Sequence, residues 1–227
     1  MNARMALLAA VALFSGSSLT FAAAPPDLSG VWSIKGTHAT VKTTDGSAPP
    51  LTPAGKAAYD KNLAAAAKGN RSAFDGTSIC LPPGLPRLML VNEPFEILQR
   101  EKTIYFVHQL NRMPRRAYVG EKLPEDEDPL YLGYSVARWD GNALVIESNS
   151  FREDTVLDDS GLPHSPSLKV TERYQLGKDG NTLHARFTIE DPATFTRPWT
   201  TDADYVKKPG FEIPEEVCAE KLVRRKK

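Results

Sequence analysis

Residues 168–176, Leu-Lys-Val-Thr-Glu-Arg-Tyr-Gln-Leu, place the strongest constraint on the fold. Successive side chains of a β-strand point to opposite faces, so every second residue shares an environment. One face is polar and suits water: Lys169, Thr171, Arg173 and Gln175. The other face suits a core: Leu168, Val170, Glu172, Tyr174 and Leu176. A carboxylate within an apolar row needs a partner, a proton or a polar cavity. The pattern therefore predicts a strand whose glutamate belongs either to a structural ion pair or to a functional site.

Short apolar runs of this kind recur along the chain, separated by turns rich in proline and glycine. About ten such strands against one helix predict an all-β domain, most simply an antiparallel β-barrel of the lipocalin or calycin kind. A β-sandwich is the alternative. The single helix begins with Thr52 as its cap and Pro53 at its first position, and it ends near Gly69. Its thin apolar stripe predicts a surface helix that lies on the sheet.

The first 22 residues have the composition of a secretory signal peptide. Arg4 precedes an apolar run, and small residues lead to a cleavage position after Ala22. The alternative is an uncleaved anchor, but the run is interrupted early for a membrane span. No cysteine follows it to carry a lipid. We therefore expect one mature domain, residues 23–227, that is periplasmic or secreted and not stably inserted in a membrane.

The charge balance and the cysteines narrow the function further. Lysine plus arginine and aspartate plus glutamate number 28 each, which argues against nucleic acid as a partner, since such a role needs a basic face. The two cysteines, Cys80 and Cys218, are expected to form a disulfide in an oxidising compartment. The alternative is two free thiols, one of them catalytic.

A second predicted strand, residues 103–110, carries His108 on an otherwise apolar face. Such a histidine is either a hydrogen-bonded core residue or a proton-transfer group. In the next strand, alternation places Arg115 on one face and Arg116 with Tyr118 on the other. We expect Arg116, beside Tyr118, to face inward.

A hairpin is predicted around Asp140-Gly141, a dipeptide that favours a type I′ turn. With these as the two loop residues, Tyr134 faces Glu147 and Arg138 faces Ala143. One face of the hairpin mixes polar and apolar groups and the other is small and apolar, so the inward side stays open.

Two loops are candidates for site residues. A proline-rich loop, residues 80–87, ends in Arg87, which is either a surface residue or is aimed into a cavity. Residues 149–167 form a long connection that contains Asp158 and His164, and loops of this length often act as lids. The acidic loop at residues 124–129 lacks the spacing and glycine of a calcium loop, so we expect it to be solvated.

Motifs for cofactors and metals are weak. The chain has no glycine-rich phosphate loop, no Ser-His-Asp order and no Cys-x-x-Cys. His38, His108 and His164 with Glu172 contain the residue types of a zinc site, but none has the close helical spacing of one. We therefore predict no metal and no cofactor.

Several motifs together resemble a family of secreted bacterial proteins without a settled activity. They span nearly the whole mature chain and read Cys-Leu-Pro-Pro-Gly-Leu-Pro-Arg, Pro-Phe-Glu-Ile, Arg-Arg-x-Tyr, Ala-Arg-Trp-Asp-Gly, Pro-His-Ser, Glu-Arg-Tyr and Arg-Pro-Trp. This chain has Tyr134 where the family pattern has histidine in Gly-His-Ser. In addition, Gly30-x-Trp32 resembles the start of lipocalins and other calycins, in which the tryptophan plugs one end of the barrel.

Two function classes follow. The first is a binding protein whose barrel holds a small apolar or aromatic molecule in a polar-lined internal cavity. The second is a cofactor-independent lyase or isomerase with His108 or Glu172 as the proton-transfer group and Arg116 as the anion stabiliser. The expected ligand-binding residues are Arg87, Arg116, Tyr118, Tyr134, Arg138, Asp158, His164 and Tyr174. The identity of the ligand and the oligomeric state do not follow from the sequence.

Overall fold

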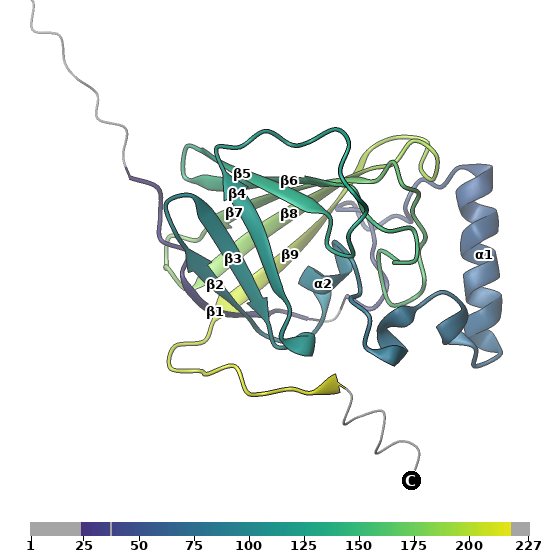
Figure 1. The fold of residues 1–227 in the computed structure, drawn as a ribbon, viewed down its shortest axis with the longest axis horizontal. Coiled ribbons are helices and arrows are strands. Elements are labelled where there is room, and N and C mark those ends of the chain that lie inside the picture. Colours follow the sequence, from purple (N-terminus) through teal and green to yellow (C-terminus); the bar gives the residue numbers. More distant parts are fainter. Residues whose placement is uncertain (1–23, 37, 219–227) are drawn as a thin grey trace, which may run out of the picture.

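The sheet closes on itself. A computed structural model describes residues 24–36 and 38–218, so the predicted signal peptide lies outside the described residues. Nine strands in this part of the chain form one closed barrel in which each strand pairs with the next and β9 pairs with β1 (Figure 1). The predicted barrel is confirmed, and the alternative of a β-sandwich is wrong.

The strands are short and lie in chain order around the barrel. Their bounds are β1 Gly30–Ile34, β2 Phe95–Gln99, β3 Thr103–His108, β4 Pro114–Val119, β5 Tyr134–Asp140, β6 Ala143–Asn149, β7 Lys169–Leu176, β8 Thr182–Glu190 and β9 Trp199–Lys207. The helices are α1 Pro53–Ala67 and α2 Arg87–Leu90, with 3₁₀ turns η1 Arg71–Ala73, η2 Gly76–Ile79 and η3 Leu110–Arg112. Residues 208–217, which follow β9, contain no strand.

One strand pair departs from the expected antiparallel pattern. β4 and β5 run parallel, with Tyr118 opposite Val136 and Val119 opposite Ala137. Residues 120–133 form a long connection that carries the chain back along the barrel before β5 begins. Parallel neighbours need such a return, whereas antiparallel ones are joined by a short turn.

Helix α1 begins as the sequence predicts, because the Thr52 hydroxyl accepts a hydrogen bond from the Gly55 amide at 3.0 Å. Its place was predicted wrongly: it lies beyond one end of the barrel instead of on the sheet (Figure 1). Gly55 fits closely there, since a Cβ atom would lie 2.3 Å from the Thr194 carbonyl oxygen. None of the described helices is long and apolar enough to cross a membrane.

The hairpin of β5 and β6 has a register two residues away from the expected one. Tyr134 lies opposite Asn149, and Arg138 lies opposite Val145. Asp140 pairs with Ala143, so the loop residues are Gly141 and Asn142 rather than Asp140 and Gly141. A shift of two residues keeps every side chain on its face, because the strand period is two.

The barrel has a hairpin end and a loop end. Aromatic side chains fill its interior, and the fully buried ones include Trp32, Phe95, Phe106, Tyr174, Phe187 and Tyr205. The loop end is covered by the long connections that contain α1, α2 and residues 150–168 (Figure 1). α2 is buried against the barrel wall, where the Tyr205 hydroxyl of β9 donates to the Met89 carbonyl at 2.8 Å.

The predicted disulfide between Cys80 and Cys218 is present, with Cα atoms 5.8 Å apart. It joins residues 138 positions apart and ties the C-terminal segment to the loop end. A loop of this length is nominally worth about 4–5 kcal/mol in the chain-entropy model.

Candidate functional site

Glu172 lies in the barrel interior, where the alternation of β7 predicts it. Its side chain is fully buried and forms an ion pair with Arg115, with N–O distances of 2.5 and 2.9 Å. The Tyr174 hydroxyl donates to the same carboxylate at 2.5 Å. Burial by itself lowers the pKa of Arg115, but the carboxylate and the tyrosine raise it above its usual value. The charge on Glu172 is therefore balanced within the core.

The inward-facing arginine of β4 was predicted wrongly. Arg115 faces inward and Arg116 faces solvent, because Arg115 alternates with the fully buried Ala117 along β4. Arg115 also donates to the hydroxyls of Ser135 and Ser148, each at 3.1 Å. Arg116 cannot stabilise an anion inside the barrel.

His108 is buried as expected, with 1% of its surface exposed. Neither ring nitrogen has a hydrogen-bond partner among the described residues. Its ring lies 5.3 Å from that of Phe95. Burial, helped by the charge of Arg115, lowers the pKa of His108 to about 3. The imidazole is therefore neutral in the folded protein at any pH near 7.

This burial predicts acid sensitivity. In the unfolded chain His108 has its usual pKa of 6.5. Below that pH, His108 binds a proton in the unfolded chain but not in the folded protein. Above pH 6.5 the imidazole is neutral in both states and the free energy of unfolding has its full value. It falls as the pH drops toward 3, because only the unfolded chain takes up the proton. We expect a loss of roughly 2 kcal/mol between pH 6.5 and 4.5, since one proton corresponds to about 1.4 kcal/mol per pH unit. Urea unfolding across this range measures the loss.

His108→Leu is the matched variant, because leucine fills an apolar position without titrating. It should flatten the pH dependence between pH 6.5 and 4.5 and keep the stability at pH 7. An unchanged slope in His108→Leu would show that the acid sensitivity comes from other groups.

Four predicted ligand-binding residues lie on the outside of the barrel. The Tyr118 and Tyr134 rings stack with centroids 5.3 Å apart. The Arg116 guanidinium lies over Tyr118 and donates to its hydroxyl at 3.2 Å. Arg138 is also exposed and pairs with Glu147 at 3.2 Å. These residues form a surface group that does not reach the interior.

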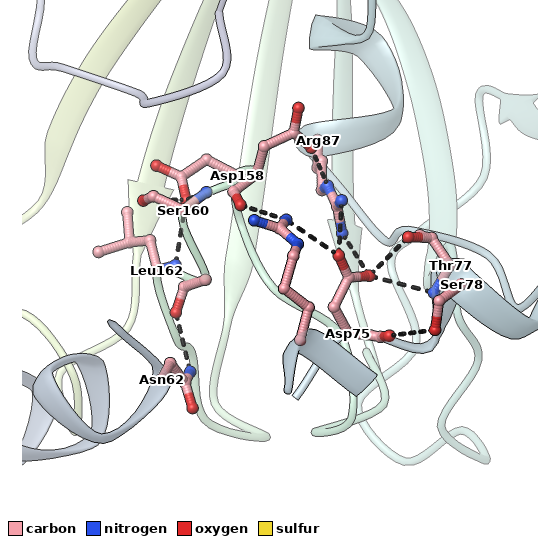
Figure 2. A network of polar contacts seen from close by, with 11 residues as sticks. Asn62, Asp75, Thr77, Ser78, Arg87, Asp158, Ser160 and Leu162 are labelled. Atoms are coloured by element: carbon pink, nitrogen blue, oxygen red, sulfur yellow. Dashed lines mark hydrogen bonds and ion pairs between the residues drawn. The ribbon is translucent and has the colours of Figure 1, made fainter. Parts of the chain in front are cut away.

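The other predicted residues apart from Tyr174, namely Arg87, Asp158 and His164, lie at the loop end. Arg87 is almost fully buried and forms a two-pronged ion pair with Asp75, each N–O distance being 2.9 Å (Figure 2). Its Nε atom donates to Asp159 at 2.8 Å. Burial by itself raises the pKa of Asp75, but the hydrogen bonds and charge of Arg87 outweigh it and lower that pKa to about 2. Arg87 thus fixes residues 75–78 against residues 158–160.

Asp158 organises the neighbouring loop. Its carboxylate accepts from the amides of Ser160 at 2.9 Å and Leu162 at 3.1 Å (Figure 2). It also accepts from the distant Val41 amide at 2.9 Å. The Asn62 side chain of α1 donates to the Gly161 carbonyl at 2.8 Å. The expected lid, residues 149–167, is therefore held by hydrogen bonds to α1, to Arg87 of α2 and to Val41.

A crevice of about 590 Å³ lies between α1, residues 72–81 and residues 153–163. We call it the α1 crevice. Its apolar lining includes Ala58, Ala73, Phe74, Ile79, Leu81, Val156 and Pro163. Its polar lining includes Lys61, Asn62, Asp75, Glu153, Asp154 and Thr155. Thr155 bonds to His164, and Asp75 bonds to Arg87, so two predicted ligand-binding residues stand directly behind the wall.

The residues considered for zinc do not come together. His108 and Glu172 lie inside the barrel, whereas His164 is bonded to Thr155 at the loop end. Within residues 24–36 and 38–218, no three histidine, cysteine, aspartate or glutamate residues are arranged to hold a metal ion.

Sequence reasoning missed three residues of these groups. Asp75 and Thr155 gave no signal, because their roles depend on loops that meet only in the fold. Arg115 did give one: it shares its strand face with Ala117, an apolar residue, whereas Arg116 shares its face with amphipathic Tyr118. Tyrosine is a poorer marker of the inner face than alanine, since its polar tip tolerates solvent.

No protein-family model matches the chain, and no curated protein does. Membership of the family of secreted bacterial proteins stays a prediction. Among solved structures, the chain is similar to apo lipid binding protein 8 of Caenorhabditis elegans, with a TM-score of 0.36 and 10% sequence identity. The match covers 79% of this chain and 94% of that chain. A likeness at this level carries nothing about ligand or activity, and the closed barrel follows from the strand pairing itself.

Proposed function

We propose that this is a periplasmic or secreted protein that binds a small molecule with an apolar body in the α1 crevice. One observation carries the proposal: a hollow of about 590 Å³ with both apolar and charged walls lies over a buried polar network. Ligand sites in proteins are typically hollows of roughly 300–1,000 Å³ with mainly apolar walls and a few polar groups.

The apolar side of the crevice favours such a ligand. Ile79 is 61% exposed and Phe74 is half-buried, and both line the hollow. Large apolar side chains left open to solvent at one place often mark a binding site. A ligand that covers them removes apolar surface from water, at roughly 25 cal/mol for each Å².

The walls of the crevice are held in position before any ligand arrives. The ion pair between Arg87 and Asp75 holds one wall. Tyr59 and Asn62 of α1 bond to Ser160 and Gly161 on the opposite wall, at 2.5 and 2.8 Å. A preformed site binds more tightly, because less ordering has to accompany binding.

The interior of the barrel is a weaker candidate. Arg115 and Tyr174 both bond to Glu172, and both of its carboxylate oxygens have partners. The aromatic rings around them are fully buried. A ligand at His108 would first have to displace the Phe95 ring, which lies against the imidazole and against Tyr205.

The location outside the cytoplasm rests on two features. The N-terminal composition is that of a signal peptide, and the Cys80–Cys218 disulfide suits an oxidising compartment.

Native mass spectrometry of the mature protein, purified from the cell envelope without unfolding, tests the proposal. Wild-type protein should retain a small molecule, and Ala58→Trp should lose it, because the indole fills the crevice from α1. Ala57→Trp is the matched control, since Ala57 is exposed on the same helix and does not line the crevice.

The control should retain the molecule as wild type does. Equal retention by Ala58→Trp and Ala57→Trp would contradict the proposed site. Wild-type protein that retains nothing would contradict the proposed function.

A further inference from the structure

A hydroxyl and an imidazole lie in contact at the inner wall of the α1 crevice. Thr155 Oγ1 is 2.7 Å from His164 Nε2, and Thr155 lines the crevice. Both residues come from the loop that the sequence marks as a candidate lid, and both are more than nine-tenths buried. Residues outside the crevice hold both side chains in position.

The hydrogen bonds fix the tautomer of His164. Its Nδ1 atom lies 2.9 Å from the Ser165 carbonyl oxygen, which can only accept. Nδ1 therefore carries the hydrogen, and in a neutral ring Nε2 presents a lone pair to the Thr155 hydroxyl. The hydrogen of that hydroxyl is shared between Nε2 at 2.7 Å and the Arg152 carbonyl oxygen at 3.0 Å. Burial lowers the pKa of His164. The hydrogen bond to Ser165 and the charges of Asp191, Glu153 and Asp154 raise it, but burial outweighs them, so the neutral ring prevails near pH 7.

Asp191 anchors Ser165, whose carbonyl orients the His164 imidazole. The amide and hydroxyl of Ser165 both donate to Asp191, each at 2.6 Å, so the carbonyl that orients His164 is itself anchored. The Phe151 ring meets the imidazole edge to face, with centroids 6.4 Å apart. Behind the hydroxyl, a Cβ atom on Gly84 would lie 2.7 Å from Thr155 Oγ1, so only glycine fits against it.

A nucleophile, a base within hydrogen-bond reach and a group that orients the base are the elements of nucleophilic catalysis by a hydroxyl. We propose that Thr155 and His164 act as nucleophile and general base on a carboxylic ester bound in the α1 crevice. This inference rests on the proposed function, since the ester has to bind there. Apolar walls at Leu81 and Val156 suit an aliphatic or aromatic acyl group.

The reaction is a two-step hydrolysis. Thr155 Oγ1 bonds to the ester carbonyl carbon while its proton passes to His164 Nε2. The bond from that carbon to the alkoxy oxygen then breaks, and the alcohol leaves with the proton from His164. In the second step His164 takes a proton from water, and the resulting hydroxide attacks the acyl carbon. The bond from that carbon to Thr155 Oγ1 then breaks, and the proton on His164 passes to Oγ1. The carboxylic acid leaves and the free threonine is regenerated.

The test measures hydrolysis of p-nitrophenyl acetate, butyrate and octanoate by the mature protein. Thr155→Val keeps the shape of the side chain and removes the hydroxyl, and we expect it to lower the rate at least ~100-fold, the size of a general-base contribution. His164→Gln should lower it similarly, and Thr155→Ser should keep the rate. Thr188→Val, on the outer face of β8, is the control and should behave as wild type.

A second readout separates chemistry from folding. After an acid quench, peptide mapping should find the acyl group on the peptide that contains Thr155, in wild type and in Thr155→Ser only. Equal hydrolysis by wild type and Thr155→Val, or no hydrolysis of any of the three esters, would overturn the assignment. Retention of a small molecule by Thr155→Val in native mass spectrometry would then leave the proposed binding function standing.

Discussion

Replacing Arg115 by methionine should lower the free energy of unfolding by about 3–5 kcal/mol, the usual cost of leaving one partner of a buried ion pair without the other. Glu172 would remain in the core with only the Tyr174 hydroxyl to balance it. Its carboxylate cannot reach solvent, since the side chain has no exposed surface. Urea unfolding at pH 7 measures the change.

The double variant Arg115→Met/Glu172→Gln is the matched comparison. A neutral glutamine still accepts from Tyr174 and leaves no buried charge, so the double variant should be more stable than Arg115→Met by at least ~2 kcal/mol. If the double variant loses as much stability as the two single variants together, Arg115 and Glu172 do not act as a coupled pair.

The single variant Glu172→Gln tests whether Glu172 has a role in ligand binding as well as in the core. Glu172→Gln alone should lower stability, because Arg115 is then buried without a counter-charge, while the folded fraction retains its small molecule as wild type does. Loss of the ligand at an unchanged melting temperature would instead assign Glu172 to the binding site.

Replacing Arg87 by methionine should lower the free energy of unfolding by about 3 kcal/mol, the lower end of the range for buried pairs. The reason for the lower value is Arg71, which stays 3.3 Å from Asp75 and is partly exposed. The change also removes the bond that holds residues 158–160 to residues 75–78, so retention of the small molecule should fall.

Asp75→Asn in the same chain should restore much of the stability, because the uncompensated charge disappears. It should not restore ligand retention, because the bond from Arg87 to Asp159 is still missing. Restoration of both by Asp75→Asn would mean that the Arg87–Asp159 bond contributes nothing to the crevice.

The barrel was predictable because its information is local. Alternation in residues 168–176 places Glu172 and Tyr174 inside, and the pairing of β7 with β6 and β8 confirms it. The same period protects against register errors: the hairpin of β5 and β6 was misplaced by two residues, yet each side chain kept its face.

The candidate site was only partly predictable because it is built from contacts between distant segments. Arg87 and Asp158 were singled out in their loops, but Asp75, which joins Arg87, and Val41, which binds Asp158, have no local signature. The crevice forms where α1, residues 72–81 and residues 153–163 come together. Strand periodicity carries no information about contacts between loops. The sequence therefore predicted a ligand cavity inside the barrel instead.

The most direct test of the binding site is a crystal structure of the protein purified from the cell envelope with its retained small molecule. The account predicts density for that molecule in the α1 crevice, against Phe74, Ile79 and Val156 and over the Arg87–Asp75 pair. Density inside the barrel beside His108, with the crevice holding only solvent, would contradict it.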